Sequence, residues 1–122
     1  MALALNIMRG GMSAGQAKSV SGAIATGLTA AGTVITDAFD LVADINVIGT
    51  AGSGSGVQLS ACELGDSQIV YNGGANSVKV YPDSSSAQIN SIAAGGAHLL
   101  ATTTACTYWR ITTTRWIAIL SA

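Results

Sequence analysis

Short runs of alternating apolar and polar residues mark most of this chain, and a period of two residues is typical of half-buried β-strands. The clearest pair of runs lies at 68–72 and 77–81, on either side of the sequence NGGAN at 72–76. Glycine and asparagine accept positive φ angles at little steric cost, so this connection is able to reverse the chain within a few residues. Pro82 ends the second run because it has no amide hydrogen for a strand ladder. The pattern predicts a β-hairpin over 66–82.

Similar apolar runs recur from residue 23 onward, separated every six to twelve residues by Gly, Asp, Ser or Thr. Strands are expected at 33–35, 39–41, 44–48, 57–60, 68–72, 77–81, 88–89, 97–102, 106–112 and 116–120. No segment between them has a helical period, which excludes the β-α-β alternation of parallel-sheet enzymes. Many short strands at this spacing predict an all-β fold, with a compact antiparallel β-sandwich or barrel-like body over residues 23–122.

The segment 1–22 is expected to form an extended N-terminal arm outside this body. Leu3, Leu5 and Ile7 would share one face of a strand, and two glycines then separate them from the next segment. About a dozen extended residues reach ~40 Å, far enough to cross onto a neighbouring subunit. These three residues and Arg9 are therefore the candidate partner-binding residues.

A capping-box pattern comes after the glycines of the arm. Ser13 and Gln16 have the Ser-x-x-Gln spacing in which two side chains satisfy amide hydrogens at a helix start. A short helix near residues 14–20 is one prediction. Because Gly15 weakens so short a helix, an irregular continuation of the arm is an equal alternative.

The composition changes the picture because charge is scarce. Only 9% of the 122 residues are Asp, Glu, Lys or Arg, against about 25% in an average soluble domain. No run reaches the ~20 apolar residues of a spanning helix, so a membrane is not expected. Apolar surface buried in an oligomer is the better explanation. The five basic residues are spread along the chain, so direct binding to nucleic acid is not expected either.

The candidate chemistry is sparse. Cys62 and Cys106 lack CxxC spacing, so they are expected to be isolated small hydrophobic residues, with a disulfide between them as the alternative. His98 is the only histidine, and with either cysteine it would make a nucleophile and base in a hydrolase. A structural histidine at a strand edge is the preferred interpretation. No catalytic residue, cofactor or enzymatic activity is predicted.

Three other groups of residues have a structural and a functional interpretation. Asp37, Asp40 and Asp44 would ring a calcium ion, but without the spacing of a known loop they are expected to stabilise turns, and no metal site is predicted. The aromatic residues would form either a sugar-stacking platform or, as preferred, core and interface anchors. They are Tyr71, Tyr81, Tyr108, Trp109 and Trp116. The Gly/Ser tract at 50–56 lacks the lysine of a phosphate loop and is expected to be a flexible connection.

A longer pattern resembles a known group of proteins. The run ADINVIGTAGSGSGVQLSACELGDSQIVYNGGANSVKVYPDSSSAQINSIAAGGAHLLATTTACTYWRI extends from Ala43 to Ile111. It resembles a widespread group of small virion structural proteins of tailed bacteriophages. Their shared order is a strand like Asp44–Ile48, a Gly-rich loop, a GV-L strand, a GD…V-N-GAN-V-VYP hairpin, an IN strand, an AAG turn and a closing aromatic strand with W.

The resemblance implies a non-enzymatic virion component. A trimeric capsid cement, or decoration, protein that clamps neighbouring major capsid subunits is the main expectation, and a tail-fibre or receptor-binding module is the alternative. The resemblance places the protein on the outer surface of the capsid after synthesis in the host cytoplasm. Its expected partners are further copies of the chain and the major capsid protein, and the group has no catalytic motif to transfer.

Overall fold

The structure of the protein, a computed structural model, describes residues 23–121, and every regular element in this range is a β-strand. The strands are β1 (Ile24–Thr29), β2 (Phe39–Asp40), β3 (Ile45–Thr50), β4 (Gly56–Gln58), β5 (Ser67–Asn72), β6 (Val78–Tyr81), β7 (Gln88–Ile89), β8 (His98–Leu100), β9 (Thr104–Thr112) and β10 (Arg115–Leu120). The prediction of an all-β fold is confirmed. The predicted arm, the alternative helix within it and the boundary at residue 22 lie outside the described residues.

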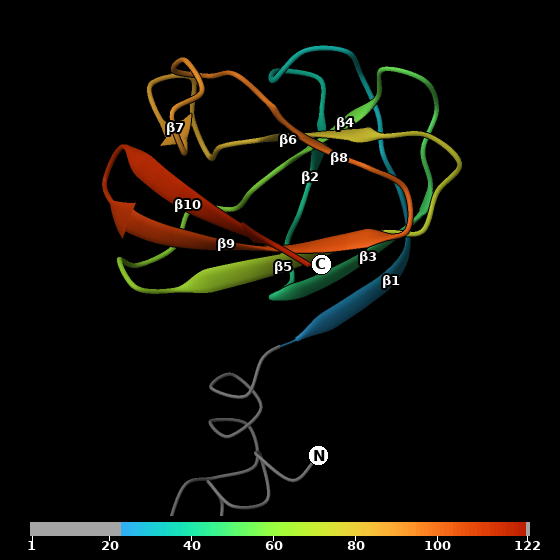
Figure 1. The fold of residues 1–122 in the computed structure, drawn as a ribbon, viewed down its shortest axis with the longest axis horizontal. Helices are drawn as coiled ribbons and strands as arrows, with labels where there is room; N and C mark the ends of the chain where they lie inside the picture. Colours follow the sequence, from blue (N-terminus) through green and yellow to red (C-terminus); the bar gives the residue numbers. More distant parts are fainter. Residues whose placement is uncertain (1–22, 122) are drawn as a thin grey trace, which may run out of the picture.

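Two sheets form two layers, which Figure 1 shows nearly edge-on. Sheet A has the order β1-β3-β5-β9-β10-β7, and sheet B has the order β2-β4-β6-β8. From β1 to β6 the chain enters the two sheets in turn, so β1, β3 and β5 are parallel neighbours in one sheet and β2, β4 and β6 in the other. This winding is β-solenoid-like.

The predicted antiparallel sandwich or barrel is therefore wrong in its strand pairing. Five of the eight strand pairs among residues 23–121 are parallel, and both sheets have open edges. Parallel pairing needs a crossover of a dozen or more residues, which is usually a helix. From β1 to β6, each crossover contains a strand of the opposite sheet instead of a helix, so the lack of helical segments did not exclude parallel strands.

Successive coils keep a similar length. In sheet A, Ile24 pairs with Ile45 and Ile45 pairs in turn with Ile69. In sheet B, Val57 pairs with Phe39 on one side and with Val80 on the other. Each step along the sequence is about 20 residues, near the lower end of the range for solenoid repeats. The last part of the chain departs from the winding, because β9 pairs antiparallel with both β5 and β10, and β8 with β6.

The core lies between the two sheets. Inward residues of sheet A, such as Val70, Tyr108 and Trp116, pack against Val57, Val80 and other residues of sheet B, and none of these is accessible to solvent. Each fully buried side chain of this size contributes about 1.5–3 kcal/mol relative to exposure. Burial between the sheets thus supplies the main stabilisation of the wound chain.

The predicted hairpin over 66–82 does not form. β5 lies in sheet A and β6 in sheet B, so the chain leaves one sheet at Asn72 and enters the other at Val78. The buried Asn72 side chain holds this corner. Its Nδ2 donates to the carbonyls of Asn76 and Leu100 at 2.9 and 3.0 Å, and its Oδ1 accepts from the Gly74 amide at 2.9 Å.

Neither glycine of this corner, Gly73 or Gly74, has a positive φ, so the backbone conformation does not require glycine here. The reason for glycine is the lack of space for a Cβ atom. A Cβ on Gly74 would lie 2.7 Å from the Ala51 Cβ and 2.8 Å from its backbone nitrogen. A Cβ on Gly73 would lie 3.0 Å from the Ile48 carbonyl oxygen. The β5–β6 connection thus packs closely on the end of β3 and on the β3–β4 connection, without room for a side chain at either glycine.

Other strand predictions hold within a few residues, with two exceptions. Residues 33–35 form a turn, since the Asp37 carboxylate accepts from the amides of Thr33 and Val34 at 3.0 and 2.9 Å. β1 was missed because Gly27, at φ 67°, interrupts its alternation and shifts its register against β3. Its pairing with β3 makes it a strand in spite of this bulge.

We expect Gly74→Ala to lower the free energy of unfolding by about 1–3 kcal/mol, because overpacking at a rigid backbone contact costs this much. Urea unfolding at a fixed protein concentration measures the change. Gly52→Ala is the matched control, since a Cβ there meets nothing within 4 Å and its φ is not positive. Equal unfolding midpoints for the two variants would contradict the packing role of Gly74.

Candidate functional site

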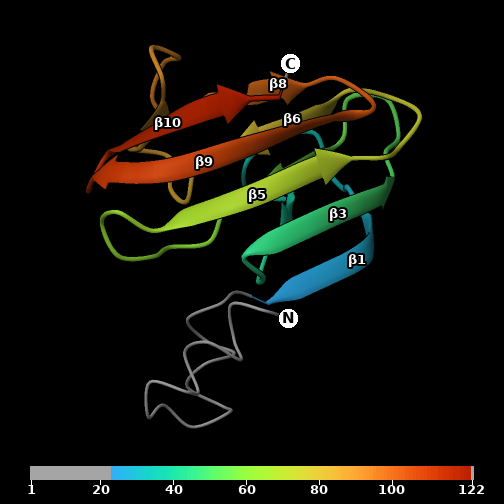
Figure 2. The ribbon, with the colours of Figure 1, turned by 60° about the horizontal axis from the view of Figure 1, so that its bottom comes forward.

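The outer face of sheet A, turned away from sheet B, is the largest candidate site. Figure 2 shows β1, β3, β5, β9 and β10 side by side, with sheet B behind them. Strand alternation places a broad set of uncharged side chains on this outer face: Ile24, Ile45, Val47, Ile69, Tyr71, Thr107, Trp109, Ile111, Ile117 and Ile119. Ile24 and Ile119 are each 57% exposed.

The strand register arranges these side chains in rows across the sheet. One row runs through paired residues of five neighbouring strands, in the order Ile24, Ile45, Ile69, Thr107 and Ile119. Neighbouring side chains in such a row stand within contact distance, so they form one continuous surface. Four of the five are isoleucine, so the row is largely apolar from β1 to β10.

The charged residues of sheet A are bound by neighbouring oxygens. Of its six strands only β9 and β10 carry any, Arg110 and Arg115. Arg110 points to the inner side, where it bonds the carbonyls of Cys62 and Thr113. Arg115 lies beside β7, where it donates to Gln88 Oε1 at 2.7 Å and to the Asn90 carbonyl at 3.1 Å. Neither guanidinium is therefore free in the middle of the outer face.

The outer face is smaller than the area that one partner buries in a stable protein interface. Five strands span about 19 Å across and six residues about 20 Å along, which gives on the order of 400 Å² in projection. The largest apolar patch of an ordinary monomer is about 300–600 Å² and is often functional. A stable interface buries about 800 Å² per partner. The outer face is thus large enough to form the centre of a contact and needs a rim to complete it.

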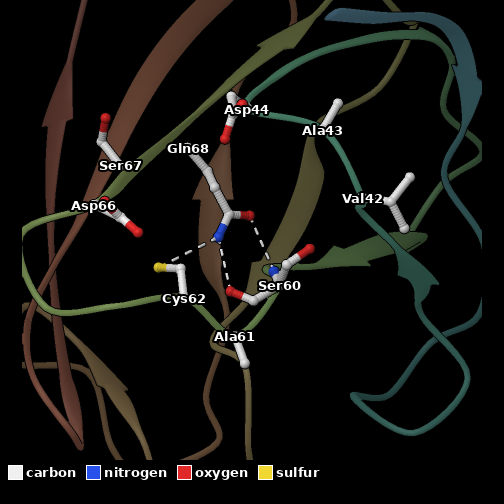
Figure 3. A pocket seen from close by; sticks show the side chains of 9 residues that line it. All are labelled: Val42, Ala43, Asp44, Ser60, Ala61, Cys62, Asp66, Ser67 and Gln68. Carbon is white, nitrogen blue, oxygen red and sulfur yellow. Dashed lines mark hydrogen bonds between the residues drawn. The ribbon is translucent and has the colours of Figure 1, made fainter. Parts of the chain in front are cut away.

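A small pocket lies at the start of β5. It is lined by the first residues of β5, by the segment before β3 and by the segment after β4. Its volume is about 170 Å³, and Figure 3 shows its lining. Gln68 fixes one wall, because its Nε2 donates to the Ser60 carbonyl at 2.7 Å and its Oε1 accepts from the Ser60 amide at 3.0 Å. The Cys62 sulfur is 3.9 Å from Gln68 Nε2. Burial raises the pKa of the Cys62 thiol, which disfavours the reactive thiolate.

The cysteine–histidine pair of a hydrolase is not assembled. His98 is not among the residues that line the pocket of Cys62. Its Nδ1 instead forms a 2.8 Å hydrogen bond with the hydroxyl of Tyr108, and burial lowers the pKa of the imidazole. Cys106 is 1% exposed, and burial raises the pKa of its thiol, so substrate has no access to it. Both cysteines are free, and the alternative of a disulfide is not realised.

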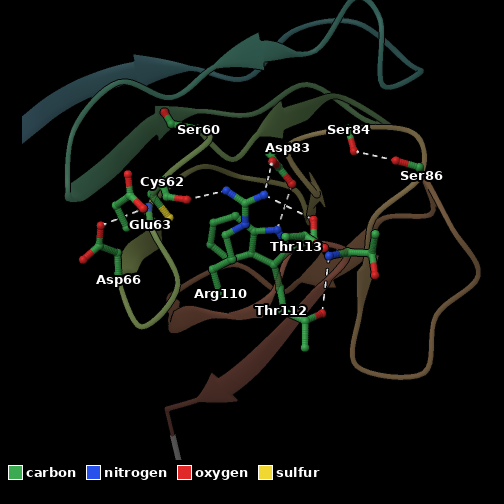
Figure 4. Close-up of polar contacts among 12 residues, drawn as sticks. Ser60, Cys62, Glu63, Asp66, Asp83, Ser84, Ser86, Arg110, Thr112 and Thr113 are labelled. Atoms are coloured by element: carbon green, nitrogen blue, oxygen red, sulfur yellow. Dashed lines mark hydrogen bonds and ion pairs between the residues drawn. The ribbon is translucent and has the colours of Figure 1, made fainter.

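A buried ion pair joins the loop after β6 to sheet A, and Figure 4 shows its surroundings. Arg110 lies 3.6 Å from Asp83, and their side chains are 16% and 9% exposed. The other carboxylate oxygen of Asp83 accepts from the Trp116 indole at 3.0 Å. Because both partners are largely removed from water, this cluster fixes the loop between the sheets. Asp83 and Arg110 are so far apart in the chain that the sequence carries no local signal of their pairing.

The three aspartates considered as calcium ligands serve other purposes. Asp37 accepts hydrogen bonds from its own turn, and Asp44 accepts from the Ala23 amide at 2.9 Å. Asp40 is exposed on β2. Within residues 23–121 no three His, Cys, Asp or Glu side chains gather in a way that would hold a metal ion.

The aromatic residues divide between core and surface. Tyr108 and Trp116 are fully buried, and Tyr81 is 7% exposed, so these three do not form a sugar-stacking platform. Tyr71 and Trp109 are each 37% exposed on the outer face. The predicted role of core anchors is confirmed for the first three, and the role of interface anchors stays a prediction for the other two.

The predicted partner-binding residues Leu3, Leu5, Ile7 and Arg9 lie outside the described residues, and their role stays a prediction. The outer face of sheet A is not among the sites predicted from the sequence. The sequence does contain one sign of this face: β3, β5 and β10 have consecutive apolar residues, so apolar side chains point to both sides of the sheet. No helix of the described chain is long and apolar enough to cross a membrane.

Comparison of the chain with family models, with curated proteins and with solved structures finds no match. The resemblance to tailed-phage structural proteins therefore stays a prediction.

We expect Asp83→Ala to lower the free energy of unfolding by about 3–5 kcal/mol, because it leaves a buried guanidinium without its carboxylate. The Trp116 indole would lose its acceptor as well. Urea unfolding at fixed protein concentration gives the difference. Asp40→Ala, at an exposed carboxylate, serves as the control and should change stability by no more than about 0.5 kcal/mol. Equal effects of both substitutions would show that the ion pair has no special role.

Proposed function

We propose that this protein is a non-enzymatic virion structural protein, a capsid cement protein that forms trimers and clamps neighbouring major capsid subunits. The observation that carries the proposal is the uncharged outer face of sheet A. The resemblance of residues 43–111 to tailed-phage structural proteins supplies the biological setting. The site of action is the outer surface of the capsid.

An apolar surface of this kind suits permanent contact. The cores of obligate interfaces are apolar and depleted of charge, with aromatic residues as anchors. Tyr71 on β5 and Trp109 on β9 lie in the middle of the outer face and are partly exposed, as such anchors would be in the free protein. Burial of a single isoleucine contributes about 1.5–3 kcal/mol, so even part of this surface supports tight association.

The fold suits a clamp for a mechanical reason. A clamp must keep its shape when neighbouring subunits pull on it, and this body is held by strand ladders in both sheets and by a buried ion pair between them. Contact area and backbone hydrogen bonds, rather than reactive groups, carry such a function. The second candidate, a tail-fibre or receptor-binding module, rests on the two partly exposed aromatic residues, which would also suit a sugar or a host surface.

The first prediction from this proposal is that the isolated protein is an oligomer at micromolar concentration. Light scattering should give about three times the chain mass of 12.1 kDa, because a monomer would expose the whole outer face to water. The mass of the double variant Tyr71→Lys/Ile119→Lys decides which contact the outer face makes: dissociation assigns the face to the contact between copies, and an unchanged mass leaves it free for the capsid. A wild-type mass near that of one chain would contradict the oligomer.

The second prediction concerns attachment to capsids. Mixed with undecorated, expanded capsids, the wild-type protein should cosediment, and Tyr71→Lys/Ile119→Lys should bind about 100-fold more weakly or worse, because about 3 kcal/mol of burial is lost. Leu99→Lys is the matched control, since Leu99 is 63% exposed on β8 of the opposite sheet.

Three outcomes separate the candidates. Equal binding by the double variant and the control would reject the outer face as the attachment site. Wild-type protein that ignores capsids but binds host cells or glycans would favour the fibre module. Immunogold labelling of purified virions tests the same distinction, because cement lies on the shell and a fibre lies on the tail.

A further inference from the structure

The free edge of β1 is the longest strand edge left open among residues 23–121. The other edge strands of the two sheets are β7 and β2, with two residues each, and β8 with three. Short edge strands are a common protection against pairing with other chains. β1 has six residues, IATGLT, without charge or proline, and only one of its sides is paired, with β3. Its one protection is the bulge at Gly27, so the edge on the N-terminal side of this glycine is a template for one more strand.

The chain before β1 contains a four-residue pattern like the start of a sheet A strand, at about one coil step from β1. Leu5 lies 19 residues before Ile24, a step between the 18 residues that separate Phe39 from Val57 and the 21 that separate Ile24 from Ile45. Leu5 begins the sequence LNIM at 5–8. β3 begins with INVI at 45–48, the same order of an apolar residue, an asparagine and two apolar residues.

The connections have matching lengths. The segment 30–44 separates β1 from β3, and the segment 51–66 separates β3 from β5. If a strand ends at Met8, the segment 9–23 separates it from β1, and this connection is as long as 30–44. The N-terminal segment therefore has both the strand sequence and the crossover length of one more coil.

We propose that residues 3–8 pair in parallel with the free edge of β1 of the same chain, with Leu5 opposite Ile24. The occupant of this edge is thus the chain's own N-terminal segment, because one coil step connects it to β1 as the later coils connect their strands. Asn6 would then point inward, as Asn46 does in β3. A further strand also removes the open edge that β1 presents.

The register has a consequence for the outer face. Leu5 opposite Ile24 places Leu3, Leu5 and Ile7 on the outer face, beyond Ile24 in the direction away from β3. The apolar face would then extend over six neighbouring strands instead of five and supply part of the rim that it lacks. This consequence for attachment rests on the proposed function, whereas the pairing itself does not.

Disulfide trapping in the full-length chain tests the pairing. Adjacent strands lie about 4.8 Å apart, which is within the Cα separation of a disulfide. In a Cys62→Ser background, Leu5→Cys/Ile24→Cys should close an intramolecular disulfide under mild oxidation, seen as a shifted monomer band without reductant. Leu5→Cys/Ile119→Cys is the control, because Ile119 lies in the same row but four strands away on β10. The buried Cys106 stays in both variants.

Hydrogen exchange supplies a second measurement that needs no cysteine. Deletion of residues 1–11 should speed amide exchange in β1 by at least tenfold and leave β9 unchanged. Covalent dimers of the Leu5/Ile24 variant would overturn the same-chain assignment, since the strand would come from another copy. Equal trapping of both cysteine pairs, or no trapping together with unchanged exchange in β1, would overturn the pairing itself. Neither assay contains capsids, so failure of the pairing would not count against the proposed function, which capsid binding tests separately.

Discussion

The architecture depends on the corner at Asn72, where a buried side chain turns the backbone out of sheet A. The side-chain Nδ2 of Asn72 donates hydrogen bonds to the carbonyls of Asn76 and Leu100, and its Oδ1 accepts one from the Gly74 amide. The connection from β8 in sheet B to β9 in sheet A also contacts Asn72, because the Thr103 amide donates to the Asn72 carbonyl at 2.7 Å. Thr103 has φ 60°, a conformation that is strained for a β-branched residue. Two crossings thus share one corner, and loss of its hydrogen bonds would affect both sheets.

The second constraint is that sheet A is apolar on both sides. Its inner side carries Val70, Tyr108 and Trp116 against sheet B, while its outer side carries the row from Ile24 to Ile119. A sheet with one solvated face normally alternates apolar and polar residues. Here the polar half of the pattern is largely missing, which accounts for the low charge of the chain and directs the functional hypothesis toward assembly. Asp83 and Arg110 are charged residues that lie between the sheets, and their ion pair joins the loop after β6 to sheet A.

These two features fit one protein that works by contact. A rigid body with an apolar face would join neighbouring subunits without any chemical step, and the pocket beside Cys62 has no histidine in its lining to make it reactive. The extra coil proposed at β1 would place the N-terminal apolar residues on the same outer face. Attachment surface and arm would then be a single structure, whereas the sequence pattern alone suggests two separate ones.

Local sequence was sufficient for most of the strands and for some of the turns. Period-two alternation located most strands, and the side chain of Asp37 stabilises its turn as aspartates in turns are expected to do. The choice of strand partner was not local. The sequence NGGAN permits a hairpin, but the space beside Ala51 and the hydrogen bonds of Asn72 direct the chain into the other sheet. The outer face was hidden for a related reason: alternation shows that residues share a side, but when both sides are apolar only the packed sheets decide which one is left exposed.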